Sequence, residues 1–221
     1  MFVVAIDGPA GSGKGTVAKL ISKKIEAVYI DTGAMFRCVA LEMLRKNVKI
    51  EDEKGVREIL DNLKIDFEQT CNSTKVFLNG RDVSKEIRTE EVSNFVSPSS
   101  KIPVIREKML VLQRKMAEEK DVIMEGRDIG TVVFPNANVK VYLDATAEER
   151  AKRRTLQNKE TGLESDYNTI LKDIKIRDAR DMEREVAPLK KADDAVYIDS
   201  TNLKIDEVVD EILKLINKAK A

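Results

Sequence analysis

The sequence contains no histidine, and this absence excludes several kinds of active site. A histidine general base, a histidine metal ligand and a Ser-His-Asp triad are all impossible. Any catalysis must therefore come from lysine, arginine, aspartate and backbone groups. The two cysteines, Cys38 and Cys71, lack the spacing of a metal site or a redox motif, and Cys38 fits a small core residue in an apolar helical stretch.

Net charge, aromatic content and long apolar runs are also low or absent. Lys+Arg and Asp+Glu balance at 39 each, and aromatic residues make up 5% of the 221 residues. This composition argues against a nucleic-acid-binding accessory domain. No apolar run approaches the roughly 20 residues of a membrane span, and the chain opens on a strand rather than on a signal peptide. We therefore expect a soluble cytoplasmic protein of one domain, with no membrane and no nucleic-acid partner.

What the sequence does contain is a glycine-rich segment between an apolar strand, residues 2–6, and a helical pattern that begins at residue 17. The segment consists of Gly8, Pro9, Ala10, Gly11, Ser12, Gly13, Lys14, Gly15 and Thr16. It fits the P-loop pattern G-x-x-x-x-G-K-[ST] with one departure, since Gly15 separates Lys14 from Thr16. This variant is typical of nucleotide kinases.

Each residue type in this segment has a chemical reason to be there. Glycines let successive backbone N–H groups point at phosphate oxygens, and the N-terminus of the following helix adds a positive end. Lys14 is expected to reach the β- and γ-phosphates, and the Thr16 hydroxyl to face Mg²⁺. An ordinary glycine-rich turn between a strand and a helix is the competing interpretation.

Short apolar strands alternate with amphipathic helices along the chain, which predicts a parallel α/β sheet. The predicted strands end on acidic residues, at the edge where open α/β sheets bind ligands. They span Phe2–Asp7, Val28–Asp31, Asp121–Glu125, Val139–Asp144 and Ala195–Asp199. The predicted helices span residues 13–25, 33–47, 52–63, 102–120, 146–159, 166–185 and 205–218. Thr146 and Glu149 fit a capping box.

Residues from about 65 to 100 break the alternation of strands and helices. Residues 65–67 and 75–78 are predicted to form short strands, and Asn79-Gly80 is a strong hairpin signal before residues 81–83. We therefore expect a small antiparallel piece inserted between two parallel strands. Whether it is functional or only a decoration is left open by the sequence.

Arginines gather at strand ends and on helices. Arg37 follows Asp31, and Arg127-Asp128 lie in a short glycine-bracketed loop after the third strand. Two helices carry further groups, Arg150, Arg153 and Arg154 on one, and Arg177, Asp181 and Arg184 on the other. Taken alone, Arg127-Asp128 could be a surface ion pair, and each cluster on a helix could be a solvated face. Beside a P-loop they favour phosphoryl transfer, which depends on positioning and on neutralising charge.

These motifs together resemble the bacterial cytidylate kinases, and the resemblance runs nearly end to end. It rests on the P-loop variant, on residues 31–37 (Asp-Thr-Gly-Ala-Met-Phe-Arg) and 86–89 (Glu-Ile-Arg-Thr), and on residues 126–135. Residues 143–145, 177–181 and 186–189 complete it. Residues 126–135, Gly-Arg-Asp-Ile-Gly-Thr-Val-Val-Phe-Pro, are long and specific, whereas a P-loop alone would leave other kinases open. Phe36 departs from the tyrosine expected there, and Thr32 from a common serine.

The resemblance implies a role for each motif. Residues 8–16 would bind ATP, with Lys14 bridging the donor phosphates and Thr16 assisting Mg²⁺. The predicted catalytic residues are Lys14, Arg127, Arg150, Arg154 and Arg184. The predicted CMP site consists of Thr32, Arg37, Ser97, Arg106, Arg127, Asp128, Arg177, Asp181 and Arg184. Within that set, Arg37, Arg127 and Arg184 would grip the acceptor phosphate. Ser97, Arg106 and Asp128 would read cytosine, and Arg177 and Asp181 would sit at the ribose.

The resemblance also implies a three-layer P-loop kinase fold, with a five-stranded parallel sheet flanked by helices, a small antiparallel β insert and a helical lid. The core would cover about 1–64, 101–149 and 185–221, the monophosphate-binding insert about 65–100, and the lid with its following helix about 150–184. The implied activity is ATP-dependent phosphorylation of CMP, and of dCMP, by a monomer. UMP as acceptor is a second possibility. A GTPase-type switch is disfavoured because no Asn-Lys-x-Asp motif is present.

Overall fold

The computed structural model describes residues 1–70, 74–118, 120–160, 162 and 165–221. It divides into two compact units, one made of residues 1–29 and 119–221 and the other of residues 30–118. Cys71 and three residues of the predicted lid, Thr161, Leu163 and Glu164, lie outside the described residues. The division into core, insert and lid stays a prediction.

The predicted five-stranded parallel sheet, flanked by helices, is confirmed. Its order is β2-β6-β1-β7-β8, and the strands span Val3–Asp7 (β1), Val28–Asp31 (β2), Val122–Gly126 (β6), Val139–Asp144 (β7) and Val196–Asp199 (β8). β1 is central, with Asp7 in register with Gly126 on one side and with Tyr142 on the other. The loops that follow β1, β6 and β7 therefore leave the same edge of the sheet, where ligands bind in this architecture.

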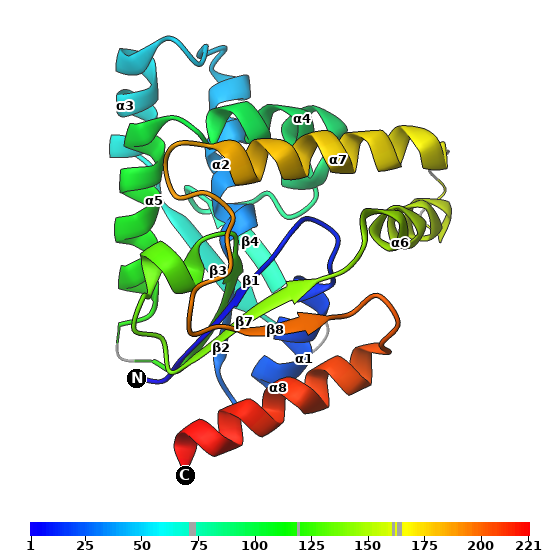
Figure 1. Ribbon diagram of the computed structural model, residues 1–221. Coiled ribbons are helices and arrows are strands. Elements are labelled where there is room, and N and C mark those ends of the chain that lie inside the picture. The colour runs from blue at the N-terminus through cyan, green and yellow to red at the C-terminus, as the bar shows by residue number, and fades with distance from the viewer. Residues whose placement is uncertain (71–73, 119, 161, 163–164) are drawn as a thin grey trace. The chain divides into compact units, whose positions relative to one another are not determined.

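Two helices cover one face of this sheet. α1 (Lys14–Lys24) and α8 (Ile205–Lys220) lie side by side against β1 and β7 (Figure 1). Their inward faces join the strands in one hydrophobic core, in which Ile6, Ile21 and Ile212 have no exposed surface. Burying such a side chain contributes about 2 kcal/mol, so the P-loop starts from a rigid strand and ends in a rigid helix.

α6 (Ala147–Glu160) and α7 (Tyr167–Glu183) pack against each other as a helical hairpin (Figure 1). The capping box predicted at the start of α6 is only half formed. Thr146 Oγ1 accepts the Glu149 N–H at 3.3 Å. The Thr146 N–H instead donates to Thr201 Oγ1, and the Glu149 carboxylate pairs with Arg153. Arg153, one turn further along α6, thus binds the Glu149 carboxylate that a complete capping box would use to accept the Thr146 N–H.

The second unit contains four α-helices among its described residues and the predicted antiparallel piece. Its helices are α2 (Thr32–Arg45), α3 (Glu53–Asp61), α4 (Glu90–Ser99) and α5 (Pro103–Met116), with a 3₁₀ turn, η1 (Glu86–Arg88). The strands β3 (Ile65–Gln69), β4 (Thr74–Leu78) and β5 (Arg81–Asp82) form a sheet in that order. Asn79 and Gly80 have φ of 51° and 82°, as a type I′ hairpin turn requires.

Helix α4 is the main element that the sequence prediction missed. Its N-cap signal is present, since the Thr89 side chain accepts from the Val92 N–H and two glutamates follow. Pro98 inside its last turn, and the two serines after it, disguise the helical pattern. No helix in the described part of the chain combines the length and apolar character needed to cross a membrane.

Candidate active site

The predicted P-loop leaves the central strand β1 and passes close to the end of β7. Gly8 has φ of 149°, and a Cβ atom there would lie 2.0 Å from the Leu143 carbonyl oxygen. Only glycine fits so close a backbone approach. The start of the loop is therefore set by the backbone conformation of Gly8 and by its contact with the neighbouring strand.

Lys14 is folded inward on the loop. Its ammonium donates to the Pro9 carbonyl at 2.7 Å and to Ser12 Oγ at 3.4 Å, and the residue is only 4% exposed. Burial, with Arg127 close by, lowers the pKa of Lys14 to about 7. An anion that approaches Lys14 raises this pKa and so stabilises the protonated side chain. The binding of an anion is therefore favoured here.

Gly15, the residue that departs from the common P-loop pattern, has a steric reason to be glycine. The Tyr29 hydroxyl donates to Glu125 Oε1 at 2.5 Å, and this pair packs on the start of α1. A Cβ at Gly15 would lie 2.6 Å from Glu125 Oε1 and 3.2 Å from the Tyr29 hydroxyl. A side chain at Gly15 would therefore require the Glu125 carboxylate to move from its place beside the Tyr29 hydroxyl.

Asp7, the last residue of β1, holds the segment that carries Arg127 and Asp128. Its two carboxylate oxygens accept the N–H groups of Ile129 and Gly130 at 2.8 and 2.7 Å. These residues begin a π-helical turn, η2 (Ile129–Val133), that the sequence did not reveal. Burial raises the pKa of Asp7 to about 6, although the two N–H donors oppose that shift.

Four of the predicted residues form two ion pairs beside this segment. Arg127 Nε donates to Asp181 Oδ2 at 2.9 Å, and Arg184 Nη2 lies 3.5 Å from Asp128 Oδ1. Arg184 also donates to the Ala187 carbonyl at 2.6 Å. Burial raises the pKa of Asp181, but Arg127, Arg177 and Arg184 together outweigh burial and hold it below its usual value. The segment after β6 and the end of α7 therefore gather several cations around two carboxylates.

The three arginines of α6 do not share one environment. Arg150 is 4% exposed and donates to the Ala10 carbonyl of the P-loop and to Asp178 of α7. Arg153 pairs with Glu149 and donates to both oxygens of Ser200, whose hydroxyl donates to the Ser12 carbonyl. The exposed Arg154 donates to Gln157 within its own helix. The sequence grouped the three by spacing, whereas side-chain direction separates them.

In the second unit, Arg37 is held by Ile87, from the motif of residues 86–89, and by Ser93, which the sequence did not single out. Asp31 caps α2 through the Ala34 N–H, and Thr32 is buried in the first turn. Arg37 Nη1 donates to the Ile87 carbonyl at 3.2 Å and to Ser93 Oγ at 2.8 Å. The helix α4 that carries Ser93 therefore helps to orient the predicted phosphate-binding arginine.

Arg106 and Ser97 also lie in this unit, on α5 and α4. The Arg106 guanidinium lies over the Phe36 ring, 5.3 Å from its centroid, and donates to the Ser100 carbonyl at 3.2 Å. Phenylalanine in place of tyrosine keeps the aromatic face that such a contact needs. Ser97 Oγ is buried without a hydrogen-bond partner among the described residues. A buried hydroxyl in this state suits a ligand that can accept or donate there.

The first helical turn after the P-loop suits a magnesium ion that arrives with ATP. The Thr16 side chain is exposed at the N-terminus of α1, beside the loop glycines. Among the described residues, no three acidic or cysteine side chains come together as a protein-only metal site. Mg²⁺ commonly keeps several waters and takes one or two protein oxygens plus substrate phosphates, so one hydroxyl fits this ion.

Comparison with known proteins identifies relatives along the whole chain. The sequence model of the cytidylate kinase family matches residues 4–218. Proteins named cytidylate kinase from Caldicellulosiruptor saccharolyticus and from a Geobacillus strain are both 50% identical to this chain over 215 residues, covering 97% of it and 95% and 96% of their own lengths. One from Lactobacillus johnsonii is 52% identical over 218 residues, covering 99% of this chain and 95% of its own.

Among solved structures, the fold resembles that of an uncharacterized protein from Eubacterium ventriosum. The TM-score is 0.53 at 15% sequence identity, over 98% of this chain and 99% of that one. An identity this low carries information on the fold alone.

Proposed function

The chain belongs to the cytidylate kinase family, and on that premise we propose how its residues transfer the γ-phosphoryl group of ATP to CMP. The observation that carries the proposal is the buried, inward-folded Lys14 in a P-loop fixed between β1 and α1. A lysine with a lowered pKa at the N-terminus of a helix gains most from a polyphosphate.

On the donor side, residues 8–16 bind the ATP phosphates and Lys14 spans the β- and γ-phosphates. Mg²⁺ supplies charge neutralisation when bound, and the Thr16 hydroxyl is the protein oxygen that would hold it. Arg150, whose guanidinium already contacts the Ala10 carbonyl, braces the loop. Arg154 is exposed and is proposed to reach the nucleotide only as part of the lid.

On the acceptor side, Arg37, Arg127 and Arg184 bind the monophosphate of CMP. Arg177 and Asp181 contact the ribose, and Thr32 is assigned to the same acceptor site. Ser97, Arg106 and Asp128 read the base. A carboxylate accepts from the cytosine N4 amine, while serine and arginine donate to N3 and O2. Uracil would place a carbonyl oxygen against the carboxylate, and a mispaired polar site rejects an analogue strongly.

The reaction is an in-line transfer. An oxygen of the CMP phosphate forms a bond to the γ-phosphorus of ATP as the bond from that phosphorus to the β–γ bridging oxygen breaks, and ADP leaves. No protein base is needed, because the acceptor phosphate is already ionised near neutral pH. Lys14 and the arginines act by neutralising charge as it moves to the leaving oxygen.

An ADP-release assay with ATP and Mg²⁺ tests this proposal when CMP, dCMP, UMP, AMP, GMP and TMP are compared side by side. We expect turnover with CMP and dCMP. Turnover with UMP at a comparable rate would overturn the base assignment to Ser97, Arg106 and Asp128 while leaving the roles of Lys14 and Arg127. No turnover with any acceptor would overturn the activity itself.

A further inference from the structure

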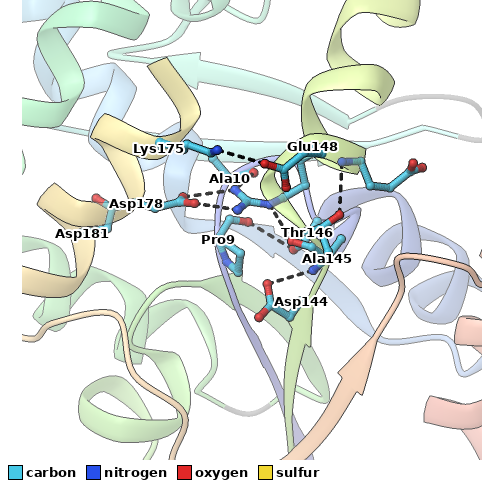
Figure 2. Close-up of polar contacts among 12 residues, drawn as sticks. Pro9, Ala10, Asp144, Ala145, Thr146, Glu148, Lys175, Asp178 and Asp181 are labelled. Atoms are coloured by element: carbon cyan, nitrogen blue, oxygen red, sulfur yellow. Dashed lines mark hydrogen bonds and ion pairs between the residues drawn. The ribbon is translucent and has the colours of Figure 1, made fainter. Parts of the chain in front are cut away.

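Helix α7 carries two carboxylates that each hold an arginine, and only one of them has a place in the proposed site. Asp181 accepts from Arg127. Asp178 lies one turn earlier on the same helix and accepts from both terminal nitrogens of Arg150, at 3.1 and 2.6 Å. Figure 2 shows the two aspartates next to each other on α7, with Pro9 and Ala10 of the P-loop nearby. Asp178 therefore faces the donor side of the chemistry.

The Arg150 guanidinium is fixed from three directions. Its Nε donates to the Ala145 carbonyl at 2.8 Å, and its Nη1 donates to the Ala10 carbonyl at 3.0 Å. Figure 2 labels Ala10, Ala145 and Asp178, the three residues that accept these bonds. The aliphatic stem also packs on the loop, since a Cβ at Gly11 would lie 3.4 Å from Arg150 Cβ. The side chain touches the loop after β7, the P-loop and α7 at once.

The pair with Asp178 decides the orientation of this guanidinium. The side chains of Arg150 and Asp178 are 5% and 13% exposed, so water competes little with the contact. Two parallel N–H···O bonds fix the plane of a guanidinium as well as its place. With that plane fixed, the nitrogen that bonds Asp178 Oδ1 also points at Ala10.

We propose that Asp178 is a positioning residue that fixes Arg150 on the Ala10 carbonyl and so holds the P-loop in the conformation that receives the triphosphate of ATP. The identity of the triphosphate rests on the proposed function. In this arrangement α7 serves both sides of the reaction. Asp178 positions the arginine that braces the donor loop, and Asp181 holds the arginine assigned to the acceptor phosphate.

A second ion pair between the same helices provides a matched control. Lys175 Nζ lies 2.9 Å from Glu148 Oε1, joining α7 to α6 as the Asp178 pair does (Figure 2). Its side chains are 57% and 53% exposed, and none of the contacts described for them reaches the P-loop. An exposed pair of this kind contributes little to stability. Removing it tests whether joining the helices is all that Asp178 does.

The experiment compares Asp178→Asn with Lys175→Met. Calorimetric titration with ATP in the absence of CMP measures the donor site directly, and steady-state kinetics separate the KM values of ATP and CMP. For Asp178→Asn we expect the Kd and KM of ATP to rise on the order of tenfold, because a small misplacement of a positioning group has effects of this size. The KM of CMP should change much less, and Lys175→Met should match the wild type.

A thermal melt shows whether Asp178→Asn folds. If it does not, the same substitution is tested in an Arg150→Met background, where no buried arginine is left without its partner. In the Arg150→Met background, adding Asp178→Asn should leave the Kd of ATP unchanged, because the residue then has no arginine to position. A further loss in that double variant, wild-type ATP affinity in Asp178→Asn, or an equal loss in Lys175→Met would overturn the proposal. A wild-type protein that binds ATP in this Asp178-dependent way but phosphorylates no CMP would contradict the proposed function alone.

Discussion

The two segments that leave the central strands of the first unit are held in place by different means. The P-loop is shaped by backbone, since Gly8 lies against the Leu143 carbonyl and Lys14 donates to the Pro9 carbonyl. The segment of residues 126–133 is held by side chains instead, with Asp7 accepting two of its N–H groups. Its Arg127 and Asp128 each pair with a charged residue from the end of α7.

This difference shows how the two segments should respond to mutation. A loop shaped by backbone geometry depends on its glycines and on the cation that it encloses, with Arg150 as its brace from outside. A segment held by carboxylates depends on residues remote in sequence, each of which can be neutralised without changing its volume. The first should fail through loss of charge at the phosphates, and the second through loss of position.

The largest effect should come from Lys14→Met, which removes the cation enclosed by the P-loop. We expect kcat to fall at least on the order of 10³-fold, as for other charge-stabilising groups in phosphoryl transfer. The rate of ADP release at saturating ATP and CMP measures it. Lys24→Met, at the exposed end of the same helix, is the control. Near-normal turnover would remove Lys14 from the chemistry.

Asp7→Asn should act through position. The amide can accept only one of the two N–H groups, so we expect unfolding to become easier by about 1–3 kcal/mol and the KM of CMP to rise more than that of ATP. Chemical denaturation and steady-state kinetics measure the two effects. Equal rises in both KM values would contradict the separate support of the two segments.

The effect of Asp7→Asn on stability should also depend on pH. Its pKa is raised from 3.8 to about 6, so the folded protein holds this proton more tightly than the unfolded chain does. Its contribution to stability is therefore full below about pH 4 and is lost as the pH rises through 6. The stability difference between the wild type and Asp7→Asn should accordingly shrink from pH 4 to pH 7.

A smaller effect is expected from Asp181→Ala, which releases Arg127 and removes the proposed ribose contact. We expect the KM of CMP to rise about tenfold, within the range for breaking a buried charge-assisted bond. Under the proposed ribose contact, the ratio of CMP to dCMP turnover should also change. Equal losses for both acceptors would assign Asp181 to holding Arg127 alone.

The smallest expected effect is the uptake of protons when ATP binds. Burial lowers the pKa of Lys14 to about 7, so at pH 8 this side chain is largely neutral in the free protein. Phosphate charge raises that pKa, and ATP binding at pH 8 should therefore take up protons, at most about one for each ATP bound. Calorimetry in buffers of different ionisation enthalpy measures the uptake. The same uptake in Lys14→Met would assign it to another group.

Local sequence was enough to predict much of this protein. The P-loop, the five parallel strands and the Asn79-Gly80 hairpin all depend on residues that are neighbours in the chain. Apolar runs, glycine spacing and turn residues report such neighbours directly. The end-to-end family motifs added the activity, which the family membership bears out.

Three features could not be predicted from local sequence. They are helix α4, the π-helical turn at residues 129–133 and the half-formed capping box. Pro98 obscured the helical pattern of α4. The turn exists where Asp7, more than 120 positions earlier, accepts its first N–H groups. Arg153 competes for the carboxylate of Glu149. Each outcome reflects competition among contacts, which a local pattern does not record.

The sequence by itself was enough to predict phosphoryl transfer, because the cation, the hydroxyl and the glycines expected to enclose phosphates are contiguous in the chain. Only the tertiary structure decided which arginine each carboxylate holds. Asp178 and Asp181 look alike in the sequence, yet one holds Arg150 against the P-loop and the other holds Arg127 after β6. The reason is that ion pairing depends on distance and side-chain direction, which the fold sets between residues far apart in the chain.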